Sequence, residues 1–173
     1  MIYTSFFDSP VGEILLASKN QKLIGVWIEG QKYYFNKIKE ESIQKDDDPI
    51  LMQMKQWLQM YFNGLNPKIP INDLAPIGTE FSNRVWKILC GIPYGKVTTY
   101  GKISDELEKI YGRKMSAQAV GSAVGHNPIS IIIPCHRVIG KDGNLTGYAG
   151  GIDKKIKLLE IEKVDMSNMY IPK

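Results

Sequence analysis

Cysteine and histidine are scarce in this chain, which has two of each among its 173 residues. The two cysteines, Cys90 and Cys135, are too few for a disulfide framework, so a reducing cytoplasm is the expected compartment. The two histidines, His126 and His136, do not combine with them in a usual metal-ligand spacing, and we expect no bound metal. The chain also lacks a phosphate-cradling glycine loop and a dinucleotide fingerprint, so no cofactor is expected.

Long apolar runs are missing as well. No segment reaches the length that a membrane span needs, and the first residues lack the charged-then-apolar order of a signal peptide. We therefore expect a cytoplasmic protein with no membrane partner.

Arginine is rare: the arginines are Arg84, Arg113 and Arg137, and all the other basic residues are lysines. Residues 1–75 hold eight lysines and nine acidic residues, a net charge of −1. Residues 76–173 hold fourteen basic and nine acidic residues, a net charge of +5. A modestly basic second half suits contacts with nucleic-acid phosphates. A solvated, lysine-rich surface explains the same charge, so charge alone does not decide the function.

The hydrophobic pattern divides the chain near Pro76, and we expect an N-terminal domain over residues 1–75 and a C-terminal domain over residues 76–173. In the first domain, alternating or apolar runs predict strands at residues 2–7, 13–18 and 23–28. The acidic tract Asp46–Asp48 then opens a predicted helix that ends at Gly64.

The second domain is predicted to be mainly helical. Thr99 can cap a helix that runs to about residue 109, and Ser116 can cap another over residues 117 to about 125. With Gly112 in the loop between them, these two helices form a predicted helix-turn-helix over about residues 100–125. The whole chain is therefore expected to have an α+β fold.

Two further helices flank this motif. The first contains Phe81 and ends at Gly91. The last runs from about residue 153 to 163 with Asp153 as its N-cap candidate, and its expected inward side chains are Ile156, Leu159 and Ile161.

The most informative residues are Pro134-Cys135-His136-Arg137-Val138, which place a thiol beside an imidazole. The apolar run Ile131–Ile133 before them predicts a buried strand that delivers both groups. Cysteine is a nucleophile as the thiolate, and a neighbouring base or cation produces one near neutral pH. The pair alone does not decide a function. Cys90, at the end of the first helix, is expected to be a buried structural thiol.

The surrounding sequence resembles the O6-alkylguanine-DNA alkyltransferases, which repair DNA by moving an alkyl group from guanine onto their own cysteine. The resemblance is carried by NPISIIIPCHRVIGKDGNLTGYAGG (residues 127–151) and IPYGKVTTYGKIS (residues 92–104). SFFDSPVGEILLAS (residues 5–18) and LIGVWI match the first domain more weakly. The resemblance implies a mixed α/β, ribonuclease-H-like N-terminal domain. Some family members bind zinc there, but this region has no cysteine or histidine here.

The resemblance also implies a mechanism, in which Cys135 displaces guanine at the alkyl carbon. His136 would take the thiol proton through water, and Glu162 would orient the imidazole. Glu162 falls at the end of a helix, where the dipole disfavours a negative charge, which hints at another partner. Tyr100 would donate a proton toward the leaving guanine. Asn127 would bond the backbone between the helix over residues 117–125 and Cys135, although Asn-Pro is also an ordinary turn signal.

The residues that would line the base pocket are also carried over by resemblance. Main-chain carbonyls of Cys135 and Val138 would accept from the guanine amino group, and Tyr148 would pack on the base. A main-chain amide near Ala149 would meet O6, with Gly150 letting the loop close tightly. Many relatives have serine where Ala149 stands, so a hydroxyl contact is lost here.

The helix over residues 117–125 has almost only small side chains, and such a thin helix suits the minor groove, about 6 Å wide. A helix packed closely against its neighbours explains the same composition. The expected DNA-binding residues are Thr99, Tyr100, Ser116, Ala117, Gln118, Ala119, Gly121 and Ser122. At Gln118 the family has an arginine that fills the gap left by the flipped nucleotide. Gln118 therefore predicts weaker DNA affinity or slower repair, with Arg113 or Lys114 in the preceding loop as candidate compensating cations.

The expected function is suicidal repair of O6-alkylguanine, and of O4-alkylthymine if the pocket admits it, by a monomer acting on duplex DNA. The alternative is a non-catalytic sensor of alkylated DNA, although such relatives usually have tryptophan at the nucleophile position. A helix-turn-helix regulator would need long base-reading side chains, which the thin helix lacks. A cysteine hydrolase would need an oxyanion-hole motif, and none is visible.

Overall fold

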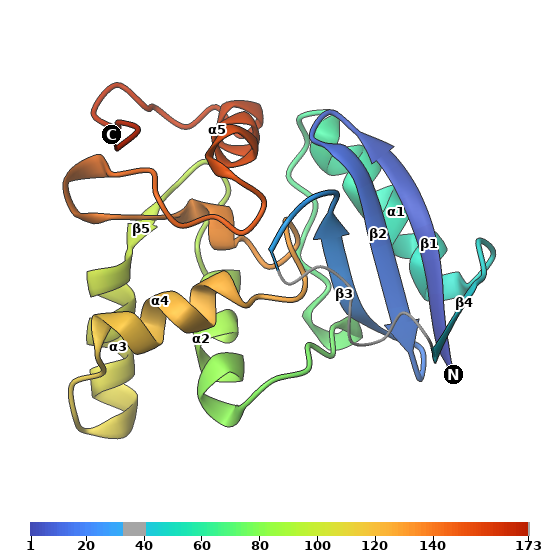
Figure 1. Cartoon of the computed structure of the whole chain (residues 1–173), viewed down its shortest axis with the longest axis horizontal. Coiled ribbons are helices and arrows are strands. Elements are labelled where there is room, and N and C mark those ends of the chain that lie inside the picture. The colour runs from blue at the N-terminus through green and yellow to red at the C-terminus, as the bar shows by residue number, and fades with distance from the viewer. Residues whose placement is uncertain (33–40, 173) are drawn as a thin grey trace. The chain divides into compact units, whose positions relative to one another are not determined.

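The computed structural model describes residues 1–32 and 41–172, which form two compact units (Figure 1). Unit 1 comprises Met1–Ile77 and Pro128–Ile132, and unit 2 comprises Gly78–Asn127 and Ile133–Lys173. The short segment Pro128–Ile132, which lies in the second half of the sequence, therefore belongs to unit 1. Each unit is described by itself.

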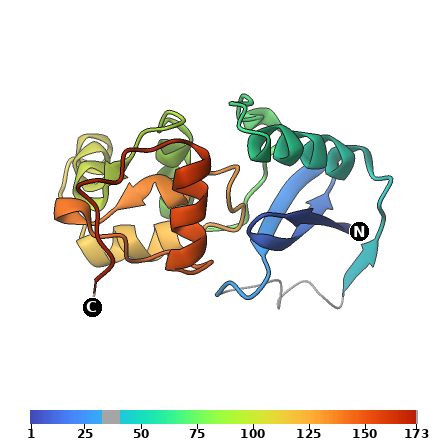
Figure 2. The same ribbon diagram turned by 90° about the horizontal axis from the view of Figure 1, so that it is seen from above.

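In its described residues, unit 1 has a four-stranded sheet and one long helix. The strands are β1 (Ile2–Ser9), β2 (Gly12–Lys19), β3 (Lys22–Ile28) and β4 (Ser42–Gln44), arranged in the order β3-β2-β1-β4. The first three pair antiparallel, and β4 runs parallel to β1. The helix α1 (Pro49–Phe62) lies along one face of the sheet, as Figure 2 shows, and a short turn η2 (Ile71–Asp73) follows it. The three strands and the helix predicted from the sequence pattern are confirmed.

The start of α1 shows why the acidic tract opens a helix. Asp48 is the N-cap, and its carboxylate accepts from Leu51 N (3.2 Å) and from Ser18 Oγ (3.0 Å). Pro49 occupies the first turn, where its missing N–H costs nothing. Asp48 is therefore a structural residue that ties the helix to β2.

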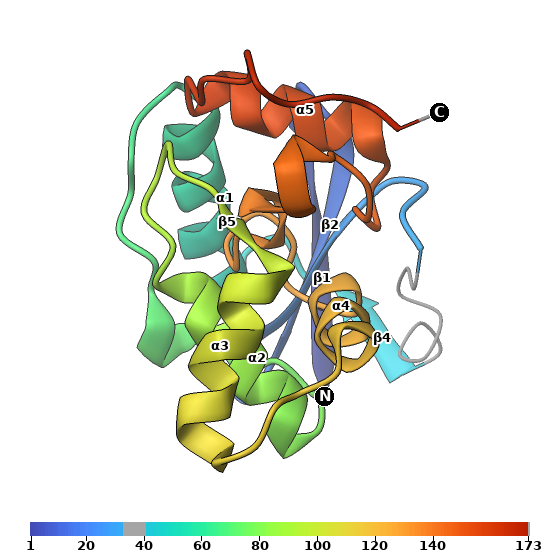
Figure 3. The ribbon, with the colours of Figure 1, turned by 90° about the vertical axis from the view of Figure 1, so that its left-hand side faces the viewer.

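The part of unit 2 that the structure describes has four α-helices: α2 (Glu80–Cys90), α3 (Tyr100–Tyr111), α4 (Ala117–Gly125) and α5 (Ile152–Ile161). Short strands β5 (Thr98–Thr99) and β6 (Val138–Ile139) pair in parallel, and η3 (Cys135–Arg137) and η4 (Lys141–Gly143) are single 3₁₀ turns. Figure 3 shows α3 beside α4 with α2 behind them. No helix in residues 1–32 and 41–172 is long and apolar enough to cross a membrane.

The helix-turn-helix forms as its local signals predict. Thr99 accepts from Lys102 N and Ser116 accepts from Ala119 N, so both expected caps are present. Gly112 ends α3 with φ 71°, in the left-handed region that favours glycine. The buried Trp86 of α2 donates from Nε1 to the carbonyl of Ala123 (2.8 Å), which joins α2 to the end of α4.

The expected strand over Ile131–Ile133 is wrong. These three side chains are buried as predicted, but their backbone forms a turn, with φ 73° at Ile131. Ile129, two residues before this run, pairs with Val26 of β3 in an isolated bridge. An apolar run shows that side chains are buried, and it does not show that the backbone is extended.

Two smaller expectations also need correction. Asp153 does not cap α5, because the helix begins at Ile152 after Gly151, whose φ is 101°. The inward residues of α5 are Lys155, Leu158 and Leu159, whereas Ile156 and Ile161 are half-buried. Cys90 was expected to be buried, and it is partly exposed at the end of α2.

Candidate active site

Cys135 begins the η3 turn directly after Pro134 and is 7% exposed. Burial raises the pKa of the Cys135 thiol above its ordinary value. A hydrogen bond with the Asn127 side chain and the positive charge of Lys155 lower that pKa and so oppose the effect of burial. The thiolate is therefore costly to form here, and its neighbours decide how readily it forms.

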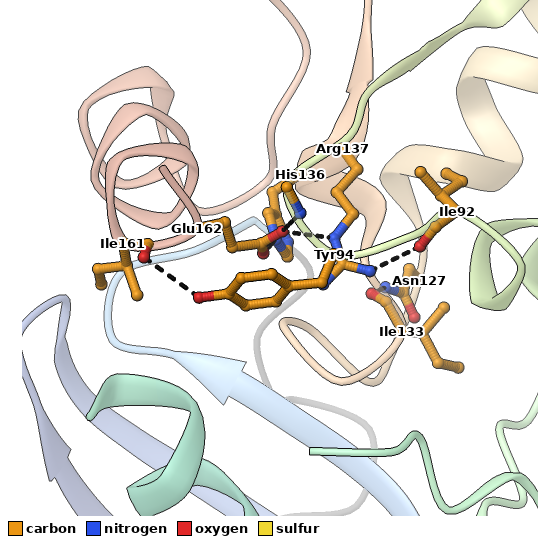
Figure 4. Close-up of polar contacts among 9 residues, drawn as sticks. Ile92, Tyr94, Asn127, Ile133, His136, Arg137, Ile161 and Glu162 are labelled. Carbon is orange, nitrogen blue, oxygen red and sulfur yellow. Dashed lines mark hydrogen bonds and ion pairs between the residues drawn. The ribbon is translucent and has the colours of Figure 1, made fainter. Parts of the chain in front are cut away.

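His136, the next residue, is fully buried and faces a carboxylate (Figure 4). Its Nε2 lies 2.5 Å from Oε2 of Glu162, whose other oxygen accepts from Arg137 Nε (2.8 Å) and from Gly95 N (3.1 Å). Burial alone would raise the pKa of Glu162, but the hydrogen bonds and charges of His136 and Arg137 lower it to about 2. The position of Glu162 at the end of a helix suggested a further partner besides His136, and Arg137 is such a partner.

The ionised carboxylate fixes the tautomer of the imidazole. A carboxylate only accepts, so Nε2 of His136 carries the hydrogen and Nδ1 carries the lone pair that can take a proton. Burial lowers the pKa of His136, while the hydrogen bond and charge of Glu162 raise it. The net shift is downward, so the imidazole is neutral near pH 7 and is available as a base.

Arg137 joins three segments around this pair. Its Nη1 donates to the carbonyl of Ile92 (2.7 Å), and its guanidinium lies 5.7 Å from the ring centre of Tyr94. The Tyr94 hydroxyl donates in turn to the carbonyl of Ile161 at the end of α5 (3.2 Å), as Figure 4 shows. The loop after α2, the η3 turn and the end of α5 are thereby held together.

Asn127 lies just after α4 and is buried. Its Nδ2 donates to the carbonyl of Ile133 (2.8 Å), two residues before Cys135 (Figure 4). This is the backbone contact that the resemblance implied for Asn127.

Tyr100 is the first residue of α3, and its hydroxyl lies close to the loop around Gly147. A Cβ atom on Gly147 would lie 2.7 Å from that hydroxyl, so only glycine allows the approach. Burial, and secondarily Cys135, raises the pKa of Tyr100 to about 12. The phenol therefore keeps its proton at neutral pH and can donate it.

Lys155 is the residue of this site that the sequence pattern did not identify. It is fully buried, and its Nζ donates to the carbonyls of Val138 (2.5 Å) and Thr146 (3.2 Å). Burial lowers its pKa to about 8, and no carboxylate in the described part of the chain forms an ion pair with it. The available signal was its helical spacing from Leu158 in α5 and from Glu162, the residue that follows this helix.

The residues expected to line a base pocket lie in the segments that Lys155 joins. Val138 and Tyr148 are buried, and the Tyr148 ring meets that of His136 edge-on at 6.4 Å between centroids. Ala149 and Gly150 follow in the same loop and are half-buried.

The surface of α4 is made of small side chains. Val120, Ala123 and Val124 face inward. The exposed residues at its start and along its outer face are Ser116, Ala117, Gln118, Ala119 and Ser122, and Gly121 is half-exposed. Thr99 and Tyr100 are half-buried at the start of α3.

A helix-turn-helix unit in which a buried cysteine precedes a histidine held by an ionised carboxylate is typical of proteins that use a cysteine nucleophile with a neighbouring base. Two family models match the chain: the 6-O-methylguanine DNA methyltransferase DNA-binding domain over residues 80–164, and the ribonuclease-like domain of the same proteins over residues 2–70. The chain belongs to the 6-O-methylguanine DNA methyltransferase family.

Relatives cover nearly the whole chain. The methylated-DNA–protein-cysteine methyltransferases of Mycobacterium tuberculosis and Haemophilus influenzae are 41% and 36% identical over 163 residues, which is 94% of this chain and 93% and 87% of theirs. A crystal structure of the M. tuberculosis O6-methylguanine methyltransferase superposes with a TM-score of 0.80 at 40% identity, covering 94% of this chain and 93% of that one. The M. tuberculosis protein in complex with DNA gives 0.78 at 40% identity, covering 94% and 92%. The expected α+β fold and family are confirmed.

Proposed function

We propose that this protein repairs DNA by transferring the alkyl group of O6-alkylguanine in duplex DNA to Cys135, once per molecule and without a cofactor. Family membership and the names of the relatives support alkyl transfer and a DNA partner. The observation that carries the role of Cys135 is that it precedes His136, whose tautomer is fixed by the ionised Glu162.

In the proposed reaction, Nδ1 of His136 takes the Cys135 proton through a water molecule, and the thiolate attacks the alkyl carbon. The S–C bond forms as the C–O6 bond breaks, and its electron pair moves onto guanine. Tyr100 donates its phenolic proton to the developing anion, which makes guanine a better leaving group. The thioether has no route back, so the protein is consumed.

The base pocket would be lined by the two segments whose carbonyls accept from Lys155, one at Val138 and one at Thr146. A carbonyl oxygen has two lone pairs, so Val138 O can accept from Lys155 and still accept from the guanine amino group. The Cys135 carbonyl would accept from the same amino group, Tyr148 would pack on the base, and the amide near Ala149 would meet O6. Gly150 would let the loop close.

DNA would contact the exposed small side chains of α4 from the minor groove. Ser116, Ala117, Ala119, Gly121 and Ser122 would line the contact, with Thr99 and Tyr100 beside it. Gln118, at the start of the helix, would hydrogen-bond the base left without a partner after flipping, with less reach and no charge compared with an arginine.

Intact-mass spectrometry tests the proposal after the protein is mixed with duplex DNA that carries one O6-methylguanine. The expected result is one added methyl group per molecule, mapped to Cys135. Cys135→Ala should gain none, and Cys90→Ala, which removes the other thiol, should react as the wild type does. A duplex with O4-methylthymine in the same assay shows whether that base is also a substrate.

The second candidate function, a sensor of alkylated DNA, is favoured by one observation, the glutamine at residue 118. Tight, lesion-selective binding without any mass change would support it over repair. The monomeric state and the reducing cytoplasm remain predictions, the latter supported by the two free thiols, Cys90 and Cys135.

A further inference from the structure

A strained turn lies four residues before the nucleophile. Ile131 has φ 73°, and the amide of Ile132 donates to the carbonyl of Ser130 (2.9 Å). A hydrogen bond between residues i and i+2 with a central φ near +75° is the rare form of the γ-turn. A β-branched side chain at positive φ is a genuine outlier. The other non-glycine residues with positive φ in the described part of the chain have no β-branch: Asn20, Gln21, Asp142 and Lys163.

Such a conformation persists only where its surroundings hold it. Within unit 1 the segment is held to β3 by two backbone bonds, Val26 N to Pro128 O (2.8 Å) and Ser130 N to Val26 O (3.0 Å). The buried side chain of Gln31 adds a third tie, because its Oε1 accepts from Ser130 Oγ (3.2 Å). The same oxygen accepts from Ile28 N (2.7 Å), which fixes Gln31 at the end of β3.

The segment is covalently joined to the site at both ends. Asn127, at the end of α4, precedes it, and Ile133 follows it and carries the carbonyl to which Asn127 donates. The amide of Cys135 then donates to Ile133 O (2.8 Å) around Pro134, whose φ of −83° and ψ of 64° make an inverse γ-turn. Two tight turns, at Ile131 and at Pro134, therefore precede Cys135.

We propose that the γ-turn at Ile131, held by Gln31 through Ser130, positions Cys135 for attack, and that unit 1 contributes to alkyl transfer through this segment. Gln31 is thus a positioning residue that does not touch DNA or the reacting atoms. The proposal rests on the function proposed above and adds a residue of the N-terminal unit to it.

If Gln31 acts in this way, its loss should slow methyl transfer and leave the affinity for DNA unchanged. The exposed face of α4 precedes the segment, so its contacts with DNA do not depend on Gln31. The position of the Cys135 sulfur follows the segment, and a small misplacement of a reacting atom slows a displacement reaction strongly.

Single-turnover methyl transfer and DNA affinity, measured for Gln31→Leu, Ser130→Ala and the double variant, test this. Gln31→Leu should slow transfer from bound DNA about tenfold or more, while the dissociation constant for unmodified duplex stays within about twofold. The double variant should be no slower than Gln31→Leu, because both changes remove the Ser130–Gln31 hydrogen bond and Gln31→Leu additionally removes the bond from Ile28 N. Gln56→Leu, an exposed glutamine of α1, is the matched control and should behave as the wild type does.

A pair of variants at the turn tests the strain itself. Ile131→Ala and Ile131→Gly remove the same atoms beyond Cβ, and glycine loses the Cβ as well, but only glycine adopts positive φ without cost. Ile131→Gly should therefore unfold at a higher temperature than Ile131→Ala, the reverse of the usual order. It should also transfer methyl more slowly than the wild type, because its turn is less fixed.

Three results would overturn the proposal: unchanged transfer by Gln31→Leu at a temperature where it is folded, an equal loss of binding and transfer, or a more stable Ile131→Ala. The wild-type protein in the same assay distinguishes a failure of this proposal from a failure of the proposed repair function. If the wild type gains no methyl group, the proposed repair function fails, and if it does, only the role of Gln31 is in question.

Discussion

At the scale of single residues, Glu162 is a buried carboxylate with two charged or polar partners. Its carboxylate is fully buried and faces His136 and Arg137, and its pKa of about 2 lies below the ordinary 4.5. A group with a lowered folded-state pKa stabilises the fold above its unfolded pKa and loses that effect as the pH falls. Glu162 therefore stabilises the protein above about pH 4.5, and this contribution disappears toward pH 2.

Glu162→Gln should consequently lower the free energy of unfolding near pH 7 by about 3 kcal/mol, since it leaves the Arg137 guanidinium buried without a carboxylate. The difference from the wild type should shrink as the pH falls from 4.5 toward 2. Urea unfolding at several pH values measures both effects. Glu160→Gln, an exposed neighbour on α5, is the control, and equal stabilities of wild type and Glu162→Gln at pH 7 would contradict the prediction.

Lys155 supports a second prediction at this scale. Its ammonium is buried without a carboxylate partner among the described residues and lowers the pKa of the Cys135 thiol. Lys155→Met should therefore raise that pKa, and the rate of alkylation of Cys135 by iodoacetamide should reach its maximum at a higher pH. His136 also responds to this change, because the charge of Lys155 contributes to the lowered pKa of the imidazole, whereas the pKa of Tyr100 is shifted mainly by burial.

The control for Lys155→Met is Lys157→Met, which removes an exposed lysine from the same helix. Its pH profile should match that of the wild type. Superimposable profiles for Lys155→Met and Lys157→Met would show that the buried charge does not act on the thiol.

At the scale of elements, α4 presents only short side chains to solvent, and Gln118 is the longest of them. Gln118→Arg should tighten binding to duplex DNA and speed methyl transfer, because a guanidinium reaches further into the gap left by a flipped base and carries a charge toward the phosphates. Fluorescence anisotropy and single-turnover transfer measure the two effects.

A control must distinguish the effect of an arginine at residue 118 from the effect of one more positive charge anywhere on the surface. Gln56→Arg adds the same charge to the exposed surface of α1, in unit 1, and should change neither quantity. If both arginine variants bind equally more tightly, the effect is non-specific, and if neither does, Gln118 is not a point of contact.

Elements that carry their own local signals could be predicted from the sequence. Thr99 and Ser116 cap α3 and α4, and Gly112 ends α3 in the left-handed region. The strand over Ile131–Ile133 was wrong because burial there is satisfied by a turn, which depends on bonds to Val26, far away in sequence. Asp153 failed as a cap because the backbone at that helix start needs a positive φ.

The residues of the site also fall into those that could be predicted from the sequence and those that could not. The positions of Asn127, His136 and Glu162 were carried over with the family, and the structure places Asn127 in hydrogen-bonding reach of Cys135 and Glu162 against His136. Lys155 was missed because a buried lysine is rare enough that any pattern treats it as a solvent-facing residue. Its partners are main-chain carbonyls, and these leave no trace in the sequence.

At the scale of the whole molecule, charge and function are unevenly distributed along the chain. Residues 76–173 carry a net charge of +5, whereas residues 1–75 carry −1. Around the helix-turn-helix, the exposed cations are Lys102, Lys109, Arg113 and Lys114, and α3 also exposes Asp105, Glu106 and Glu108. The surface that would meet DNA is therefore only weakly positive.

This weak surface charge predicts a shallow dependence of DNA affinity on salt. Each phosphate neutralised contributes about 0.9 to the slope of log K against log salt concentration, so a few contacts give a slope between about −2 and −4. Anisotropy titrations from low to moderate salt measure it. Arg113→Gln should reduce the slope by about 1 if that side chain contacts a phosphate, whereas Lys19→Gln, exposed on β2, should leave it unchanged. A slope steeper than about −6 would mean that far more of the surface meets DNA than the helix-turn-helix.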